Sequence, residues 1–572
     1  MITIKEDICK NVPGDTSLFI TFPYKQEIVD VLHKCEVALY DKKTNTWEVV
    51  LTDLAFLIDS LAYLDDLDIN ILPTPKSVSK GLKTTLNYKL KPFVYQQDGI
   101  EYGINHDKWL LLDDMGLGKS KQTIHIAEEL KAQEGLEHCV IICCICDLRS
   151  NWEKEIRIHS DLSCRIIGKR VSSKTGKVSY STIKERAEEI KTKIDEFFII
   201  INIETFRNAD FIKAFKNSKN KFDMIVVDEI HRCKDTQSLQ GSNLSKLSAK
   251  YQIAATGTLL LNNPLDLYMP LKWLNIEKCS LGIFKKYFCI FSPVIPGQVI
   301  GFKHMDILKE QIANNSLRRT KEQVFGDGGL PPISFIEEYL ELSDEHRKLY
   351  ETIENGVRDE LLKIKLNKRA LLSTLMRLRQ ATSCPQVLTN DTKIVSSKQT
   401  RCLDLVESII SRGDKVIVVS GFKDAIKFLD NALKDIPHVV CTGDISSDTM
   451  DRNKERFQND PDCKVMLCTW QKIGTGHTLT AANYMIHLDT AWTWGLFKQT
   501  CDRIYRVGAK KPVFIYNLIC KDTVDEIVYR IVNRKKTVGD ILIDEPELDT
   551  ATVNSILSDL KVNEHKKQKG RY

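Results

Sequence analysis

The stretch WLLLDDMGLGKSKQTIHIAEEL, residues 109–130, decides the fold of this chain. An apolar run (109–112) is followed by a short loop with two glycines and then by a segment of helical character. A strand, a tight loop and a helix in this order bring backbone N–H groups and the positive end of a helix to one point, where phosphate groups bind. Gly116 and Gly118 allow the backbone to curl around such a group. The sequence therefore predicts a phosphate-binding loop at the edge of an α/β sheet.

The side chains of this loop have expected tasks. Lys119 would reach the β and γ phosphates of ATP, and the Ser120 hydroxyl would hold Mg²⁺. The common pattern G-x-x-x-x-G-K-[ST] begins with glycine, whereas this chain has Asp113 at that position. A GKS tripeptide often arises by chance, so the prediction depends on its setting between a strand and a helix. The expected ATP-binding residues of the loop are Asp113, Asp114, Met115, Gly116, Leu117, Gly118, Lys119 and Ser120.

A second candidate site follows another apolar run, in MIVVDEIHRCKD (224–235). The run ends in Asp228 and Glu229, and the carboxyl ends of parallel strands are where open α/β sheets bind ligands. ATP hydrolysis needs one carboxylate to hold Mg²⁺ and a second to orient the attacking water. We assign Asp228 to the metal and Glu229 to the water. The alternative is an acidic helix cap after a buried strand.

Two sets of apolar runs alternate with helical stretches along the chain. Buried strands that alternate with helices predict parallel sheets covered on both faces. The chain is therefore predicted to be α/β, with two sheet-containing units separated by a mostly helical, charged stretch. The expected strands are 109–112, 139–145, 197–201, 224–228 and 251–256 in the first set, and 415–420, 438–442, 464–469, 484–489 and 512–519 in the second.

Composition excludes several classes of protein. The chain has 572 residues and a net charge of only +5, which excludes a simple polycationic coat for DNA but leaves room for local basic clefts. Neither a signal peptide nor an apolar run near the ~20 residues of a membrane span is visible. The 17 cysteines include Cys143, Cys144 and Cys146 in one apolar run. Because no paired CxxC clusters occur, we expect reduced, structural thiols in a cytosolic protein.

The motifs together resemble helicase superfamily two, and within it the Swi/Snf-type ATPases, over most of residues 84–545. DDMGLGKSKQT is similar to the phosphate loop of that family, including its aspartate in place of glycine. LRSNWEKE (148–155) resembles the segment that meets the DNA backbone, and QTCDRIYRVG (499–508) resembles the motif that carries arginine fingers. The resemblance implies two RecA-like parallel-sheet lobes with a helical insertion between them and a small α+β N-terminal domain.

The same resemblance implies roles for further residues. Gln96 would contact adenine, and Arg503 and Arg506 would stabilise the transferring phosphoryl group. The alternative for these arginines is a basic stripe on an exposed helix. At Ile473 and Tyr505 this sequence departs from the usual residues of the family motifs. These departures affect the inferences about coupling and DNA contact, not the inference about ATP hydrolysis. The implied coupling residues are His231, Thr256, Gly257, Thr258, Gly474, Gly476 and Gln499, and the implied DNA-binding residues are Asn151, Trp152, Thr469 and Trp492.

The leading segment resembles the HARP-like module that precedes the motor of annealing helicases, where it helps to recognise branched DNA. The shared residues are Tyr24, Tyr40, Asp41 and Trp47. The alternative is a generic small domain whose aromatic residues form its core. The expected domains are a HARP-like α+β domain (1–72), a linker (73–83), lobe one (84–290), a mostly helical insertion (291–394), lobe two (395–545), and a C-terminal helix with a basic tail (546–572).

The sequence thus predicts an ATP- and Mg²⁺-dependent motor, a DNA-dependent ATPase that tracks along double-stranded or branched DNA. The expected tasks are DNA repair, recombination, branch migration or fork remodelling, in the cytoplasm of a bacterium or a virus-infected host and at its nucleoid. The alternatives are a strand-separating or RNA-dependent helicase, and a nucleic-acid-binding scaffold with weak ATPase activity.

Overall fold

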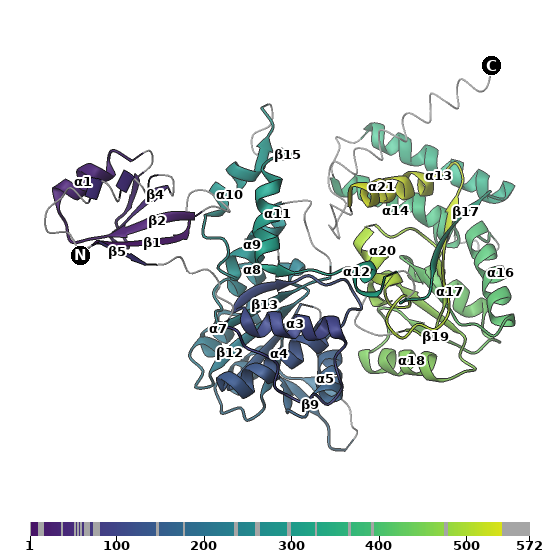
Figure 1. The fold of residues 1–572 in the computed structure, drawn as a ribbon. Coiled ribbons are helices and arrows are strands. Elements are labelled where there is room, and N and C mark those ends of the chain that lie inside the picture. The colour runs from purple at the N-terminus through teal and green to yellow at the C-terminus, as the bar shows by residue number, and fades with distance from the viewer. Residues whose placement is uncertain are drawn as a thin grey trace. The chain divides into compact units, whose positions relative to one another are not determined.

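The computed structural model shows a chain rich in both helices and strands (Figure 1). The residues that the structure describes are 2–9, 16–35, 38–50, 53, 56–57, 60–61, 69–72, 80–144, 148–174, 178–233, 238–257, 264–293, 299–326, 329–363, 368–389, 394–473, 479–492 and 494–539. The expected C-terminal helix and tail, 546–572, therefore lie outside the described residues, as does most of the expected linker.

The chain divides into two compact units. The first contains Met1–Leu112, Lys119–Arg170 and Ser179–Arg318, and the second contains Asp113–Gly118, Val171–Val178 and Arg319–Tyr572. The phosphate-loop residues 113–118 are thus grouped with the second unit, whereas residues 1–112 before them and 119–170 after them are grouped with the first.

A fully parallel sheet of seven strands organises the first unit. All five strands expected here are confirmed, and the structure adds two short strands, one at each edge, whose sequences are too short to give a periodic signal. The order across the sheet is β16 (Ser316–Leu317), β6 (Lys108–Leu111), β13 (Tyr251–Ala255), β12 (Phe222–Asp228), β7 (His138–Cys143), β11 (Phe198–Asn202) and β8 (Cys164–Ile166).

Apolar side chains cover both faces of this sheet, which explains why its strands are continuous apolar runs. Alternate strand residues enter two separate cores. One core packs against α3 (Val94–Asn105), α4 (Lys119–Glu134) and α5 (Leu148–His159). The other packs against α7 (Ala209–Lys216), α9 (Pro264–Trp273), α10 (Leu281–Phe288) and α11 (Met305–Asn314), among others.

A second parallel sheet, of six strands, organises the second unit (Figure 1). The five strands expected here are also confirmed. The order is β17 (Ile333–Leu340), β22 (Val513–Cys520), β21 (Tyr484–His487), β18 (Val416–Ser420), β20 (Val465–Thr469) and β19 (His438–Cys441). The helices are α12 (Lys321–Phe325), α13 (Asp344–Lys363), α14 (Lys368–Ser383), α15 (Gln386–Thr389), α16 (Ser397–Ser411), α17 (Lys423–Ala432), α18 (Ser447–Asn459), α19 (Trp470–Ile473), α20 (Trp494–Cys501) and α21 (Val524–Gly539).

The stretch 291–394, expected to be a mostly helical insertion, contains the helices α11 to α15 and also strands. It contributes β16 to the first sheet and the eight-residue β17 to the second, in addition to its helices. The strand β17 pairs with β22, a strand almost 180 residues later in the chain. Its polar residues Ser334, Glu337 and Glu338 interrupt the apolar pattern and hid it from a search for continuous apolar runs, and such residues are tolerated because β17 is an edge strand.

A buried polar cluster ties α14 to the carboxyl edge of the second sheet. Asp489, 1% exposed, accepts hydrogen bonds from the Trp470 indole Nε1 at 3.0 Å and the Gly421 backbone N–H at 3.0 Å. The Arg379 guanidinium, also buried, lies 3.3 Å from the same carboxylate and 3.9 Å from the centre of the Trp492 ring. The cluster therefore fixes three loops of the sheet edge relative to one another.

We expect Arg379→Met to destabilise the second unit by about 3 kcal/mol, because it leaves a buried carboxylate without its cation. Urea unfolding measures the change. The control is Arg456→Met, which removes an exposed pair with Asp460 and should cost less than about 1 kcal/mol. Equal effects of the two substitutions would contradict a buried, cation-dependent cluster.

The N-terminal segment folds as a small α+β domain with its own core. Its sheet has the order β3 (Ala38–Asp41), β4 (Thr46–Val50), β2 (Thr16–Thr21), β1 (Ile2–Ile8) and β5 (Ile69–Leu72), and α1 (Gln26–Leu32) packs against it. Across the described part of the chain, every helix is too short or too polar to cross a membrane.

Candidate active site at the carboxyl edge of the first sheet

The phosphate loop has the conformation that its glycines require. It leaves β6, passes Gly116 at φ +87° and Gly118 at φ +76°, and ends where α4 begins at Lys119. Both angles lie in the left-handed region that residues with a Cβ rarely adopt. Ser120 is the second residue of α4, so Lys119 and Ser120 both stand at the N-terminus of a 16-residue helix. Met115 and Leu117 are buried and anchor the loop.

The aspartate that replaces the first glycine of the loop has a structural partner. Asp113 is fully buried, and its Oδ1 accepts a hydrogen bond from Arg319 Nε at 3.0 Å. The backbone N–H of Asp114 donates to the Arg319 carbonyl at 2.9 Å, and the backbone N–H of Lys321 donates to Asp114 Oδ2 at 3.3 Å. Sequence reasoning missed Arg319 and Lys321, although the basic run RRTK directly after β16 is a signal that could have found them.

The two carboxylates of the second motif stand at the carboxyl end of β12, as predicted. The Asp228 carboxylate accepts a hydrogen bond from the Trp152 indole Nε1 at 2.9 Å. Burial first, and then the charge of the neighbouring Glu229, raise the pKa of Asp228 to about 6, although the Trp152 hydrogen bond and the Lys119 ammonium oppose this rise.

The pKa of Asp228 leads to a prediction. We expect Mg²⁺-dependent ATP binding by the free chain to weaken as the pH falls through about 6, because a protonated carboxyl is a poor ligand for the cation. An ordinary aspartate, with a pKa near 3.8, would stay ionised there. The measurement is the Mg²⁺ concentration for half-maximal ATP binding between pH 5 and 8. A constant value across that range would contradict the prediction.

Glu229 is held in a strained conformation and linked to the third motif. Its backbone φ is +56°, a value that costs a non-glycine residue of order 1–3 kcal/mol and that clusters at functional sites. Its Oε2 lies 3.3 Å from His231 Nδ1, and that nitrogen also lies 3.0 Å from the Thr256 hydroxyl. His231 and Thr256, both predicted coupling residues, therefore connect the carboxylate motif to the end of β13.

The predicted arginine-finger segment is held by Lys321. The buried Lys321 ammonium lies 2.5 Å from Asp502 Oδ1 and donates to the Tyr505 carbonyl at 2.7 Å. A Cβ placed on Gly116 would lie 3.1 Å from Arg506 Cγ, so Arg506 contacts the phosphate loop within the second unit. The Arg503 side chain is 8% exposed. The structure thus brings Arg506 to the loop, and the finger roles of Arg503 and Arg506 stay predictions.

The remaining predicted residues differ in their accessibility. Trp152 is 1% exposed and Thr469 is 4% exposed, so neither side chain offers a surface for DNA in this structure. Asn151 and Trp492 are half-buried, and the Trp492 ring is covered on one side by Arg379. Gln96 is 3% exposed, and its Oε1 accepts a hydrogen bond from the Phe93 backbone N–H at the start of α3.

Three other predicted coupling residues cannot be compared with the structure. Thr258, Gly474 and Gly476 lie outside the described residues. Gly257 is the second residue after β13, and Gln499 is half-buried on α20. The coupling roles of both residues stay predictions.

The residues present fit a magnesium ion. Asp228 and Glu229 supply carboxylate oxygens, the donor type that Mg²⁺ prefers, and Ser120 supplies a hydroxyl. The buried Oε2 of Glu229 lies 3.3 Å from His231 Nδ1 but makes no hydrogen bond within the described part of the chain. The described residues contain no cluster of three or more metal-ligating side chains. A magnesium ion bound by one or two carboxylates and by substrate phosphates needs no such cluster.

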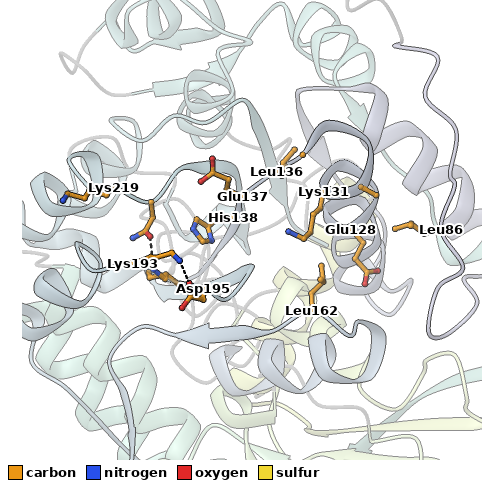
Figure 2. Close-up of a pocket in the computed structure, with 14 residues that line it drawn as sticks. Leu86, Glu128, Lys131, Leu136, Glu137, His138, Leu162, Lys193, Asp195 and Lys219 are labelled. Atoms are coloured by element: carbon orange, nitrogen blue, oxygen red, sulfur yellow. Dashed lines mark hydrogen bonds and ion pairs between the residues drawn. The ribbon is translucent and has the colours of Figure 1, made fainter.

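A cavity of about 990 Å³ lies elsewhere in the first unit (Figure 2). It is lined by residues before β11, such as Lys193 and Asp195, and by His138, the first residue of β7. These positions are at the amino ends of the strands, whereas Asp228 is at a carboxyl end. Lys193 and Asp195 form an ion pair of 3.0 Å with each other. The cavity is therefore separate from the candidate active site.

The fold and site together define a helicase-type ATPase. Residues 26–387 match the SNF2-related domain, and residues 397–508 match the helicase conserved C-terminal domain. The first match covers more than half of the chain, and the chain therefore belongs to the SNF2-related family.

Curated relatives share this region. An uncharacterized ATP-dependent helicase of Mycoplasma pneumoniae is 26% identical over 86% of this chain and 47% of its own length. The putative ATP-dependent helicase/translocase YwqA of Bacillus subtilis is 24% identical over 77% of the chain and 48% of its own length. The chain thus spans about half the length of these bacterial relatives.

Animal and archaeal proteins also match. The SWI/SNF-related matrix-associated actin-dependent regulator of chromatin subfamily A-like protein 1 of Drosophila melanogaster is 24% identical over 91% of the chain and 66% of its own length. A solved structure, the Sulfolobus solfataricus SWI2/SNF2 ATPase core in complex with dsDNA, covers 83% of this chain and 99% of that chain at 25% identity, with a TM-score of 0.38.

Proposed function

We propose that this protein is an ATP-driven motor that tracks along double-stranded DNA. The observation that carries the proposal is the arrangement at the carboxyl edge of the first sheet. Lys119 begins the helix after the phosphate loop, Asp228 ends β12, and the next residue, Glu229, lies 3.3 Å from His231, which in turn contacts Thr256. A site that served only to bind a nucleotide would not need this link. Membership of the SNF2-related family supports the same function.

The proposed reaction is hydrolysis of the terminal phosphate of ATP. Lys119 binds the β and γ phosphates, Asp228 and Ser120 hold Mg²⁺, and Glu229 orients the attacking water and accepts its proton. The bound Mg²⁺ supplies positive charge to the phosphate oxygens. Arg506, which contacts the phosphate loop, adds a second positive charge where negative charge develops.

Movement follows if ATP binds one arrangement of the two units more tightly than another. A ligand shifts a conformational equilibrium only by its difference in affinity for the two states. A motor must hold the nucleic acid mainly by its phosphates, because it moves over every sequence. We therefore expect binding to weaken steeply with salt and to depend little on sequence.

ATPase rates against a panel of nucleic acids test the proposal. The panel contains linear duplex DNA, single-stranded DNA, a fork, a four-way junction and duplex RNA. We expect duplex-containing DNAs to stimulate hydrolysis. Stimulation by RNA alone, or by single strands alone, would favour a strand-separating or RNA-dependent helicase. A rate unaffected by every nucleic acid would favour the scaffold alternative.

We further propose branched DNA as the preferred substrate, with tasks in repair, recombination or branch migration at the nucleoid. Two aromatic residues of the HARP-like segment support this proposal, because Tyr24 is 78% exposed and Tyr40 is 45% exposed. These two rings are therefore available to stack on unpaired bases. Tyr40 also packs against Trp47, with ring centres 5.2 Å apart. The test is Tyr24→Ala with Tyr40→Ala, which should remove a preference for forks and junctions and leave hydrolysis on linear duplex in place.

A further inference from the structure

Two cysteine thiols contact each other beside the candidate active site. Cys144 is the first residue after β7, and Cys233 is the last residue of η3 (Ile230–Cys233), the short helix that follows Glu229. Their sulfur atoms lie 3.5 Å apart, and either thiol can donate a hydrogen bond to the other. Both residues belong to the first unit, so the pair forms within one compact body.

This pair closes the segment that carries the second motif. Cys143, the last residue of β7, is the register partner of Asp228, the last residue of β12. The chain then passes through Glu229, at φ +56°, and η3 brings Cys233 back to Cys144. The proposed water-orienting carboxylate therefore lies in a segment whose two ends are both held against the end of β7.

The two thiols differ in their accessibility. Cys233 is 1% exposed and belongs to the core on one face of the sheet, whereas Cys144 is half-buried and packs against the same core. The hydrogen bond with Cys233, and then burial, raise the pKa of the Cys144 thiol. The pair therefore rests as thiols at neutral pH, and a small oxidant reaches it through Cys144.

We propose that Cys144 and Cys233 are a modification site, at which a peroxide forms a reversible disulfide that slows ATP hydrolysis. A disulfide has a sulfur–sulfur distance of about 2.05 Å, so the two sulfur atoms must approach each other by about 1.5 Å. Because Cys233 is packed in the core, η3 and the adjoining Glu229 share this displacement. The slowing rests on the proposed function, whereas formation of the bond does not.

The proposed chemistry consumes one peroxide for each disulfide. The Cys144 sulfur, as the thiolate, attacks one oxygen of the peroxide, the O–O bond breaks, and the hydroxide that leaves takes up the thiol proton to become water. The Cys233 sulfur then attacks the sulfur of the resulting sulfenic acid, and the S–O bond breaks. The hydroxyl leaves as a second water with the proton of the Cys233 thiol. The second step is fast relative to attack by a free thiol, because the two sulfur atoms are already in contact.

Peptide mapping without reductant tests whether the bond forms. The full chain is freed of reductant and treated with hydrogen peroxide, its remaining thiols are alkylated, and the digest is analysed by tandem mass spectrometry before and after dithiothreitol. We expect peptides joined through Cys144 and Cys233 that dithiothreitol separates. Sulfinic acid at Cys144 without the cross-link, or pairing of Cys144 with a different cysteine, would overturn the proposal.

ATPase rates test the consequence of the bond. We expect peroxide to lower the DNA-stimulated kcat of the parent chain about tenfold or more, because a displacement of about 1 Å in a catalytic group has effects up to about 10²-fold. Dithiothreitol should restore the rate. The dissociation constant of ATP should change less than about threefold, since the phosphate loop lies outside the bridged segment. A cross-linked chain with the parental kcat would overturn the effect on hydrolysis.

Two variants each remove one sulfur of the pair. Cys144→Ser and Cys233→Ala should hydrolyse ATP within about twofold of the parent rate in reductant and keep that rate after peroxide, because cysteine at these positions serves as a small packing residue. The matched control is Cys164→Ser, at a half-buried cysteine of β8 in the same unit, which should stay as sensitive to peroxide as the parent. Equal sensitivity of all three variants would overturn the assignment of the pair.

Failure of the motor and failure of the bond give different results. A mapped cross-link in a chain that does not hydrolyse ATP would overturn the proposed function, and with it the slowing, while the modification site stands. A chain with DNA-stimulated hydrolysis and no cross-link would overturn the modification site and leave the motor in place.

Discussion

Lys119→Ala should reduce ATP turnover about 10²- to 10³-fold while leaving affinity for duplex DNA nearly unchanged. The lysine is the first residue of α4, where it completes the phosphate loop, and its ammonium also favours the ionised form of Asp228. Its loss therefore removes a charge from the phosphate site and raises the pKa of Asp228 further. Both effects act on the chemical step and on binding of the Mg²⁺–ATP complex.

The measurements are the steady-state ATPase rate with saturating duplex DNA and DNA affinity by fluorescence anisotropy. Lys131→Ala is the matched control, because Lys131 is on the same helix but packs over the Phe197 ring, away from the loop. It should keep the parent rate. If Lys119→Ala lost DNA binding together with turnover, the separation of the nucleotide site from the DNA grip would be wrong.

Arg506→Ala should reduce kcat about 10³- to 10⁵-fold, the range for arginines that stabilise the transferring phosphoryl group. Arg506 contacts Gly116 of the phosphate loop, and Lys321 holds the neighbouring Tyr505 carbonyl at 2.7 Å. The arginine is thus placed before the reaction begins, which is the condition for strong electrostatic stabilisation. Arg506→Lys should recover little, since a lysine lacks the planar, bidentate geometry.

Separate measurements of kcat and of the ATP dissociation constant distinguish a slower chemical step from weaker ATP binding. We expect the dissociation constant to change far less than kcat, because the charge that Arg506 offsets develops mainly in the transition state. Arg452→Ala, on α18, is the control for loss of a guanidinium in the second unit. An Arg506→Ala variant with weakened ATP binding and a parental kcat would show that the residue binds substrate instead.

Both predictions involve residues that were found from the sequence, whereas their supporting partners were not. Arg319 binds Asp113 across 206 residues of sequence, Lys321 binds Asp502 across 181 residues, and Trp152 binds Asp228 across 76 residues. In each pair, one residue belongs to a motif that was recognised in the sequence. Its partner had no predicted role or, in the case of Trp152, a different one. The sequence predicted that Trp152 contacts DNA. In the structure its side chain is buried in the core, and its indole N–H donates a hydrogen bond to Asp228, the proposed magnesium ligand.

The sequence by itself determined the elements and the reacting groups. Apolar runs buried on both faces, such as 224–228, must be strands of a covered parallel sheet, and a loop with Gly116 and Gly118 before a helix must expose its N–H groups. These are consequences of local chemistry, because period, glycine conformation and helix termini involve neighbours along the chain. The polar edge strand β17 escaped the same argument, since its partner β22 is far away in sequence.

Only the tertiary structure decided which side chains meet. The order and register of the strands place Thr256 beside His231 and set α5 so that Trp152 reaches Asp228. Such contacts depend on packing between elements, where a shift of one residue turns every side chain of a strand to the opposite face. The reacting groups of this chain can therefore be identified from short sequence motifs. The side-chain contacts between those motifs form only when the sheet folds.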